Sequence, residues 1–169
     1  MPPALYTPEQ RARRDATAWT LVQGVLAPIQ FLVFLVSLVL VLRCMATGEG
    51  EQWALWSVVI KTPTLYTIMI TGCIWEKVVF GRYLFAPAFF WEDVFSMLVL
   101  ALHTAYLWVW WQGQWSAGDQ LLLALAAYVT YGINAAQYIR KLRMARLQRP
   151  QILSSELEQT TASGPQVSL

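Results

Sequence analysis

The sequence predicts an all-α integral membrane protein built as a four-helix bundle. Of its 169 residues, 57% are hydrophobic and only 13% are charged, a composition typical of membrane proteins. Four apolar runs each approach or exceed the roughly 20 residues that cross a bilayer as a helix. We expect the spans at about residues 19–42, 53–75, 94–111 and 121–139 of one domain covering residues 1–149.

The basic residues predict the orientation of these spans. Three arginines precede the first span and five basic residues between 140 and 149 follow the fourth, whereas the opposite side carries only Arg43. Because lysine and arginine concentrate in cytoplasmic segments, both termini and the loop between the second and third spans are expected in the cytoplasm. The basic run after the fourth span is also expected to contact anionic lipid.

Two segments lie outside the predicted spans. Thr7, Pro8 and Gln10 form a helix-start pattern, which predicts a short N-terminal helix at the membrane interface. Residues 150–169 are rich in Ser, Thr and Gln and are expected to form a disordered tail. Cys44 and Cys73 fall near opposite ends of their spans, so we predict neither a disulfide nor a metal site from them.

Three carboxylates gather around the loop between the second and third spans. Glu76 closes one span, and Glu92 and Asp93 open the next among aromatic neighbours. Acidic residues in a first helical turn also complement the helix dipole, which is a purely structural explanation. In apolar surroundings, however, a carboxyl is hard to ionise and suits proton donation. Glu76 either faces Glu92 across the helix hairpin as a second carboxyl or pairs with Lys77 or Arg82.

Helical spacing places a series of side chains on one face of the third span. The series steps by three or four residues: Glu92, Ser96, Val99, His103 and Tyr106. A mostly polar face on a lipid-embedded helix should point into the bundle. In the fourth span, Tyr131, Asn134 and Tyr138 follow the same spacing and form a candidate polar stripe.

Lys61 and His103 are expected at comparable depth, roughly 15 Å or more from the carboxylates along their helices. Snorkelling to the outer face is one explanation of Lys61, and hydrogen-bonded packing is one explanation of His103. The functional alternative makes His103 an axial ligand of a metallated macrocycle. The sequence contains no phosphate-binding loop, nucleophile elbow or zinc-protease motif, and nothing supports nucleic-acid binding.

Several ungapped stretches carry a resemblance to a known family. They read YTPEQRARRD (6–15), WTLVQGVLAPIQF (19–31), WEKVVFGRYLFAPAFFWEDV (75–94) and LHTAY (102–106). The chain resembles the vinyl bacteriochlorophyllide hydratases, small membrane enzymes of bacteriochlorophyll biosynthesis in phototrophic bacteria, over about residues 6–146. The resemblance implies location in the bacterial inner (intracytoplasmic) membrane.

The resemblance implies addition of water across the C3 vinyl group of a Mg-chlorin or bacteriochlorin, chlorophyllide a or 3-vinyl bacteriochlorophyllide a. No cofactor is implied, because the magnesium belongs to the substrate; membrane lipid and other pigment-biosynthesis enzymes are the further partners expected. Against this chemistry we assign Glu92 as proton donor, with Asp93 or Glu76 orienting the water. The substrate-binding assignments are Arg82 and Lys77 to the pigment propionate, His103 or Tyr106 to the magnesium or ring, and Lys61.

Two other classes of protein fit parts of the sequence. A non-catalytic tetrapyrrole-binding or transport protein would use the nine tryptophans to line a cavity, although their places near span ends fit an interfacial belt. A structural subunit of a photosynthetic complex would need no interior carboxylate. Conversion of a vinyl pigment to its hydroxyethyl product distinguishes the enzyme from both.

Overall fold

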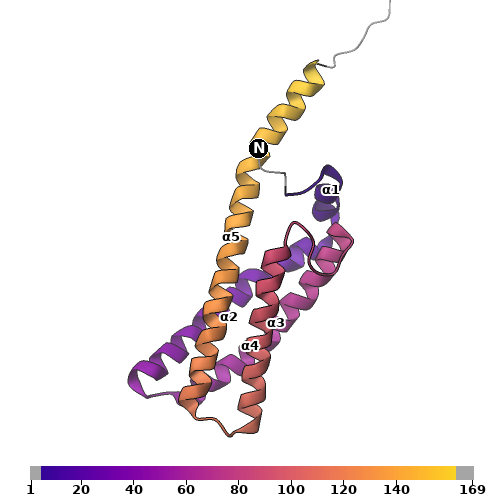
Figure 1. The fold of residues 1–169 in the computed structure, drawn as a ribbon. Coiled ribbons are helices and arrows are strands. Elements are labelled where there is room, and N and C mark those ends of the chain that lie inside the picture. The colour runs from indigo at the N-terminus through magenta and orange to yellow at the C-terminus, as the bar shows by residue number, and fades with distance from the viewer. Residues whose placement is uncertain (1–4, 163–169) are drawn as a thin grey trace, which may run out of the picture.

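The computed structural model describes residues 5–162, with side chains described through residue 144 and for Arg146. This part of the chain forms helices and contains no strand. In order (Figure 1), they are α1 (Pro8–Ala16), α2 (Ala18–Thr47), α3 (Glu51–Phe80), α4 (Phe90–Gln112) and α5 (Ala117–Ala162). Four of them are long and apolar enough to cross a membrane, which confirms the four predicted spans.

Local sequence signals explain where the helices begin and end. Thr7 Oγ1 accepts a hydrogen bond from the Gln10 amide at 3.2 Å, and Gln10 Oε1 accepts one from the Thr7 amide at 2.9 Å. This capping box starts α1, so the predicted short N-terminal helix is present. At their C-terminal ends, α2 stops at Gly48 and α3 stops at Gly81. Both glycines adopt a positive φ, which glycine tolerates because it has no Cβ to clash.

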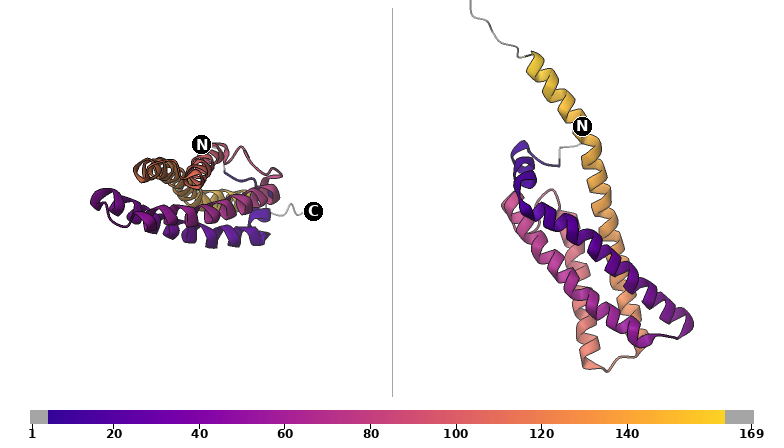
Figure 2. Two further views of the ribbon diagram at one scale, coloured as in Figure 1. Left: turned by 90° about the horizontal axis from the view of Figure 1, so that it is seen from below. Right: turned by 180° about the vertical axis from the view of Figure 1, so that it is seen from behind.

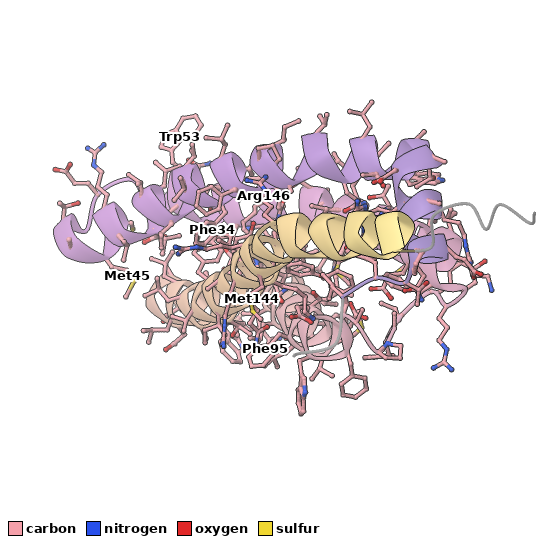
Figure 3. All side chains as sticks on the ribbon, turned by 90° about the horizontal axis from the view of Figure 1, so that it is seen from above. Phe34, Met45, Trp53, Phe95, Met144 and Arg146 are labelled. Carbon is pink, nitrogen blue, oxygen red and sulfur yellow. The ribbon has the colours of Figure 1, made fainter. Side chains whose placement is uncertain are left out.

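The four long helices form two layers, each a hairpin. α2 packs along α3, and α4 packs along α5, while the contacts between the hairpins are less extensive. Figure 2 shows the two layers when the bundle is viewed from below. Phe34 reaches from α2 toward α5 (Figure 3), where its ring centroid lies 4.6 Å from that of Tyr131 and 5.4 Å from that of Tyr128. Aromatic packing of this kind joins the layers.

The distribution of polarity is that of a membrane bundle. Large apolar side chains such as Leu32, Val36, Leu98 and Val129 are exposed on the outside. Several polar or charged side chains are instead buried: Gln30, Ser37, Lys61, Thr62, Glu76, Glu92, Asp93, Ser96, His103, Gln120 and Asn134. Hydrocarbon tolerates an apolar exterior and penalises exposed polar groups, so functional polar groups belong inside the bundle.

α1, the loop at residues 81–89 and the C-terminal part of α5 lie at one end of the bundle, and the α2–α3 and α4–α5 turns lie at the other (Figure 1). This is the arrangement that an even number of spans requires; which end faces the cytoplasm stays a prediction, as does the interfacial position of α1.

The expected disordered tail is wrong over residues 150–162, which continue α5. A helix that is already formed extends at little cost, and the leucine, glutamate and glutamine residues of this segment favour it. Pro150 removes one backbone hydrogen bond without ending the helix. Residues 163–169 lie outside the described part of the chain.

Candidate active site

The predicted polar face of α4 points into the bundle. Glu92, Ser96, Val99, His103 and Tyr106 are all buried, with exposed fractions between 0 and 6%. The three-and-four spacing in the sequence therefore identified the interior side of this helix correctly.

Glu76 of α3 and Asp93 of α4 form the central contact of the site. Their exposed fractions are 5% and 3%, and their carboxyl groups lie within hydrogen-bonding reach of each other. A carboxylate only accepts hydrogen bonds, so this contact requires a proton between the two groups. One of the two alternatives for Glu76 was that it faces Glu92; the structure places Asp93 there instead, because Asp93 lies one residue further around α4.

The loop at residues 81–89 is bonded to this carboxyl pair. The Phe85 amide donates to Asp93 Oδ2 at 2.7 Å, and the Ala86 amide donates to Glu76 Oε2 at 3.4 Å. Phe85 has a φ of 58°, an unfavourable value for a residue with a bulky side chain. The two carboxyls thus hold the loop in a conformation that its own backbone disfavours.

Glu92 is engaged by α5 rather than by Glu76. Lys141 Nζ lies 2.6 Å from Glu92 Oε2, also donates to the Ala88 carbonyl, and lies 4.7 Å from the centroid of the Phe89 ring. The ion pair therefore engages this carboxyl with Lys141 rather than with the carboxyls of Glu76 and Asp93. The basic run after the fourth span was expected to contact anionic lipid, and Lys141 departs from that expectation, because its side chain turns inward.

Replacement of Lys141 by methionine is expected to lower the stability of the bundle by about 1–3 kcal/mol, because it leaves a buried carboxylate without its charged donor. Thermal unfolding followed by tryptophan fluorescence in detergent measures this effect. Arg140→Gln is the matched control, since it removes a positive charge from the exposed neighbouring position. Equal transitions for the two variants would show that the ion pair contributes nothing.

Lys61 and His103 form a second buried contact, deeper in the bundle. Lys61 Nζ lies 2.8 Å from His103 Nε2, and both residues are fully buried. His103 Nδ1 donates to the Val99 carbonyl at 2.8 Å, so Nε2 is left to accept from Lys61. The expected equal depth is confirmed, and snorkelling of Lys61 is wrong. The nitrogen that would bind a macrocycle's metal is already occupied by Lys61.

Aromatic rings surround the Lys61 ammonium. Nζ lies 4.7 Å from the ring centroid of Tyr131, 5.1 Å from that of Tyr128 and 5.9 Å from that of Phe34. The faces of aromatic rings attract a cation. Among the described residues, no carboxylate forms an ion pair with Lys61. They explain how a lysine is accommodated at this depth.

The remaining predicted substrate-binding residues occupy different environments. The Tyr106 hydroxyl is buried and donates to the Leu55 carbonyl at 3.1 Å. Lys77 and Arg82 are exposed near the loop. Lys77 Nζ donates to the Gly81 carbonyl at 3.0 Å, and within the described part of the chain neither cation forms an ion pair with Glu76. That alternative for Glu76 is therefore wrong.

Sequence reasoning missed Lys141 as part of the site, although a signal was present. Asn134, Tyr138 and Lys141 step by four and three residues, so Lys141 continues the polar stripe of α5. Because Lys141 also belongs to the basic run that follows the fourth span, its place in the polar stripe was overlooked. In the part of the chain described by the structure, no three His, Cys, Asp or Glu side chains are grouped so as to hold a metal ion.

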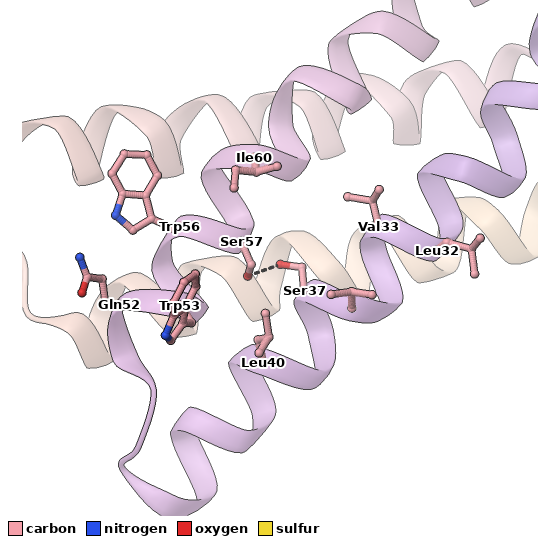
Figure 4. A pocket seen from close by; sticks show the side chains of 10 residues that line it. Leu32, Val33, Ser37, Leu40, Gln52, Trp53, Trp56, Ser57 and Ile60 are labelled. Atoms are coloured by element: carbon pink, nitrogen blue, oxygen red, sulfur yellow. Dashed lines mark hydrogen bonds between the residues drawn. The ribbon is translucent and has the colours of Figure 1, made fainter.

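A large groove of about 710 Å³ opens between α2 and α3, away from the carboxyl groups. Leu40, Trp53 and Trp56 are among the mostly apolar side chains that line it, and Ser37 and Ser57 are hydrogen-bonded at 2.7 Å within it (Figure 4). Ser57 precedes Glu76 by 19 residues, about 28 Å along a helix. This groove is therefore distinct from the site at the carboxyl pair.

Fold and site together define a multi-pass helical membrane protein with proton-sharing carboxyls inside its bundle. Comparison with known proteins identifies the family within this class of membrane protein. The family described as 2-vinyl bacteriochlorophyllide hydratase (BCHF) matches residues 6–144, and the chain belongs to this family. No solved structure matches the chain.

Two relatives are similar over most of their length. A 2-vinyl bacteriochlorophyllide hydratase of Cereibacter sphaeroides is 71% identical over 143 residues, which cover 85% of this chain and 89% of the relative. A protein of the same description from Rhodobacter capsulatus is 68% identical over 145 residues, covering 86% and 84%. Relationships this close confirm the resemblance drawn from the sequence and assign the chain to the hydro-lyases.

Proposed function

We propose that this protein adds water across the C3 vinyl group of a vinyl bacteriochlorophyllide or chlorophyllide, giving a 1-hydroxyethyl group in bacteriochlorophyll biosynthesis. The observation that carries the mechanism is the buried contact between the carboxyl groups of Glu76 and Asp93. It keeps a proton available in an apolar interior, which is what protonation of a carbon–carbon double bond needs.

The reaction divides into two balanced steps. The shared proton of Glu76 and Asp93 adds to the terminal vinyl carbon, the π bond breaks, and the adjacent carbon becomes a cation that the macrocycle delocalises. A water oxygen then bonds to that carbon and loses a proton to the carboxyl pair. The pair returns to its starting state, and the net change is addition of one water without a redox cofactor.

This assignment modifies the roles expected of the three acids. Glu76 and Asp93 together become the proton donor, and Glu92, held in place by Lys141, becomes the group that stabilises the developing cation. Lys77 and Arg82, exposed beside the loop, remain the proposed partners of the pigment propionate. The proposed contacts of His103, Tyr106 and Lys61 with the pigment require that their present hydrogen bonds be exchanged.

Access to the acids requires movement of part of the protein, because Glu76 and Asp93 are almost completely buried. The loop at residues 81–89 is the segment bonded to both of them, and the positive φ of Phe85 favours its release. We place this end of the bundle at the cytoplasmic face of a bacterial inner membrane, in contact with lipid and within reach of other pigment-biosynthesis enzymes.

The direct test is incubation of membranes containing the protein with a 3-vinyl pigment. We expect a blue shift of the long-wavelength absorption band and a product heavier by one water in mass spectrometry. Membranes without the protein are the control. Pigment that binds and is recovered unchanged would instead identify a non-catalytic tetrapyrrole-binding or transport protein.

A further inference from the structure

Asn134 of α5 carries a polar atom that the rest of the bundle leaves unsatisfied. The residue is 8% exposed, and its Nδ2 donates to Ser96 Oγ at 2.8 Å. This bond orients the amide, and its Oδ1 is buried without a hydrogen-bond partner among the described residues. A buried oxygen in this state costs stability unless a small donor occupies the adjacent space.

The serine that holds the Asn134 amide belongs to the immediate surroundings of the carboxyl pair. Ser96, which holds the Asn134 amide, follows Asp93 by three residues and lies on the same buried face of α4. One helical turn is about 5 Å along the axis. Tyr138, one turn after Asn134 on α5, lies close to the same serine and to both Glu76 and Asp93. The amide is thus bonded to a serine one turn from Asp93, and a tyrosine near that serine lies beside both acids.

The chemistry of the reactants identifies the missing donor. All four ring nitrogens of a magnesium-bound macrocycle lack hydrogen, and the keto, ester and carboxylate groups at its edge only accept hydrogen bonds. A pigment therefore offers nothing to Asn134 Oδ1. Water donates two hydrogens, and buried waters in proteins bind to unsatisfied polar groups of this kind.

We propose that Asn134 holds the water that is added to the vinyl group. This inference rests on the proposed function. The water donates one hydrogen to Asn134 Oδ1 and directs the other toward the carboxyl pair, which accepts a proton once it has protonated the vinyl carbon. Its oxygen lone pair then faces the cation, and the carbon–oxygen bond forms on one face only.

Attack from one face has a measurable consequence, because the carbon that receives the hydroxyl becomes a stereocentre. The wild-type protein should form one epimer of the 1-hydroxyethyl product in large excess. In Asn134→Leu and Asn134→Ala, the water is no longer fixed, so the ratio should move toward 1:1 and the rate should fall at least 10-fold. The ratio is measured on the product formed, so it does not depend on how much variant protein folds.

Gln120→Leu is the matched control for these variants. Gln120 lies near the opposite end of α5, is 6% exposed and likewise has a buried oxygen to which no described residue is hydrogen-bonded. Its replacement should leave both the rate and the epimer ratio unchanged. A wild-type product without epimeric excess, or the wild-type ratio in both Asn134 variants, overturns the inference. Absence of any hydration by the wild-type protein refutes the proposed function instead.

X-ray hydroxyl-radical footprinting of the wild-type protein without pigment tests the water independently of activity and of any variant. Side chains beside a bound water are modified, so Tyr138 should be labelled. Tyr106 should not, because it is buried and its hydroxyl is paired with the Leu55 carbonyl. Labelling of Tyr138 no greater than that of Tyr106 would show that no water is held there.

Discussion

Replacement of Glu76 by glutamine or of Asp93 by asparagine is expected to lower hydratase turnover at least about 100-fold, the usual scale of a lost general acid. Each change preserves shape but removes one of the two groups that share a proton inside the bundle. The measurement is the rate of hydroxyethyl product formation in membranes, normalised to the amount of folded protein.

Two further variants make this experiment decisive. Glu51→Gln changes an exposed carboxylate on the same helix as Glu76 and should leave turnover unchanged. Glu92→Gln tests the rival donor: because Glu92 is ion-paired with Lys141, we expect a smaller loss than for the other two acids. A loss confined to Glu92→Gln would return the proton-donor role to that residue.

Replacement of His103 by leucine is expected to produce the largest loss of stability. It removes the only hydrogen-bond acceptor of the Lys61 ammonium in the described part of the chain and leaves a charge in the bundle interior. We expect a cost of about 2–3 kcal/mol, or a fall of roughly 5–10 °C in the thermal transition in detergent.

The double variant Lys61→Met/His103→Leu separates a structural from a functional role of this pair. Because it replaces both polar groups by apolar ones of similar size, most of the lost stability should return. Recovered stability with unaltered turnover would make the pair purely structural. Recovered stability with weakened pigment binding would support the predicted substrate contacts. A double variant no more stable than His103→Leu contradicts our account of the contact.

Some features of the site could be predicted from the sequence, and others could not. The burial of Glu92, Ser96, His103 and Tyr106 followed from their spacing alone, since a helix repeats every 3.6 residues. The equal depth of Lys61 and His103 followed from counting residues from the ends of their spans. The partners of the three acids did not follow, and Glu92 was assigned the role that the structure favours for Glu76 and Asp93.

By itself, the sequence determined the membrane class, the number of spans, the family and the inward face of α4, because composition, length and helical period act within one segment. Only the tertiary structure decided that Asp93 meets Glu76, that Lys141 reaches Glu92 and that the Asn134 amide oxygen lacks a partner within the described part of the chain. These contacts depend on the rotation of each helix about its axis and on its shift along its neighbours. Many side-chain contacts set those quantities together, and no single segment encodes them.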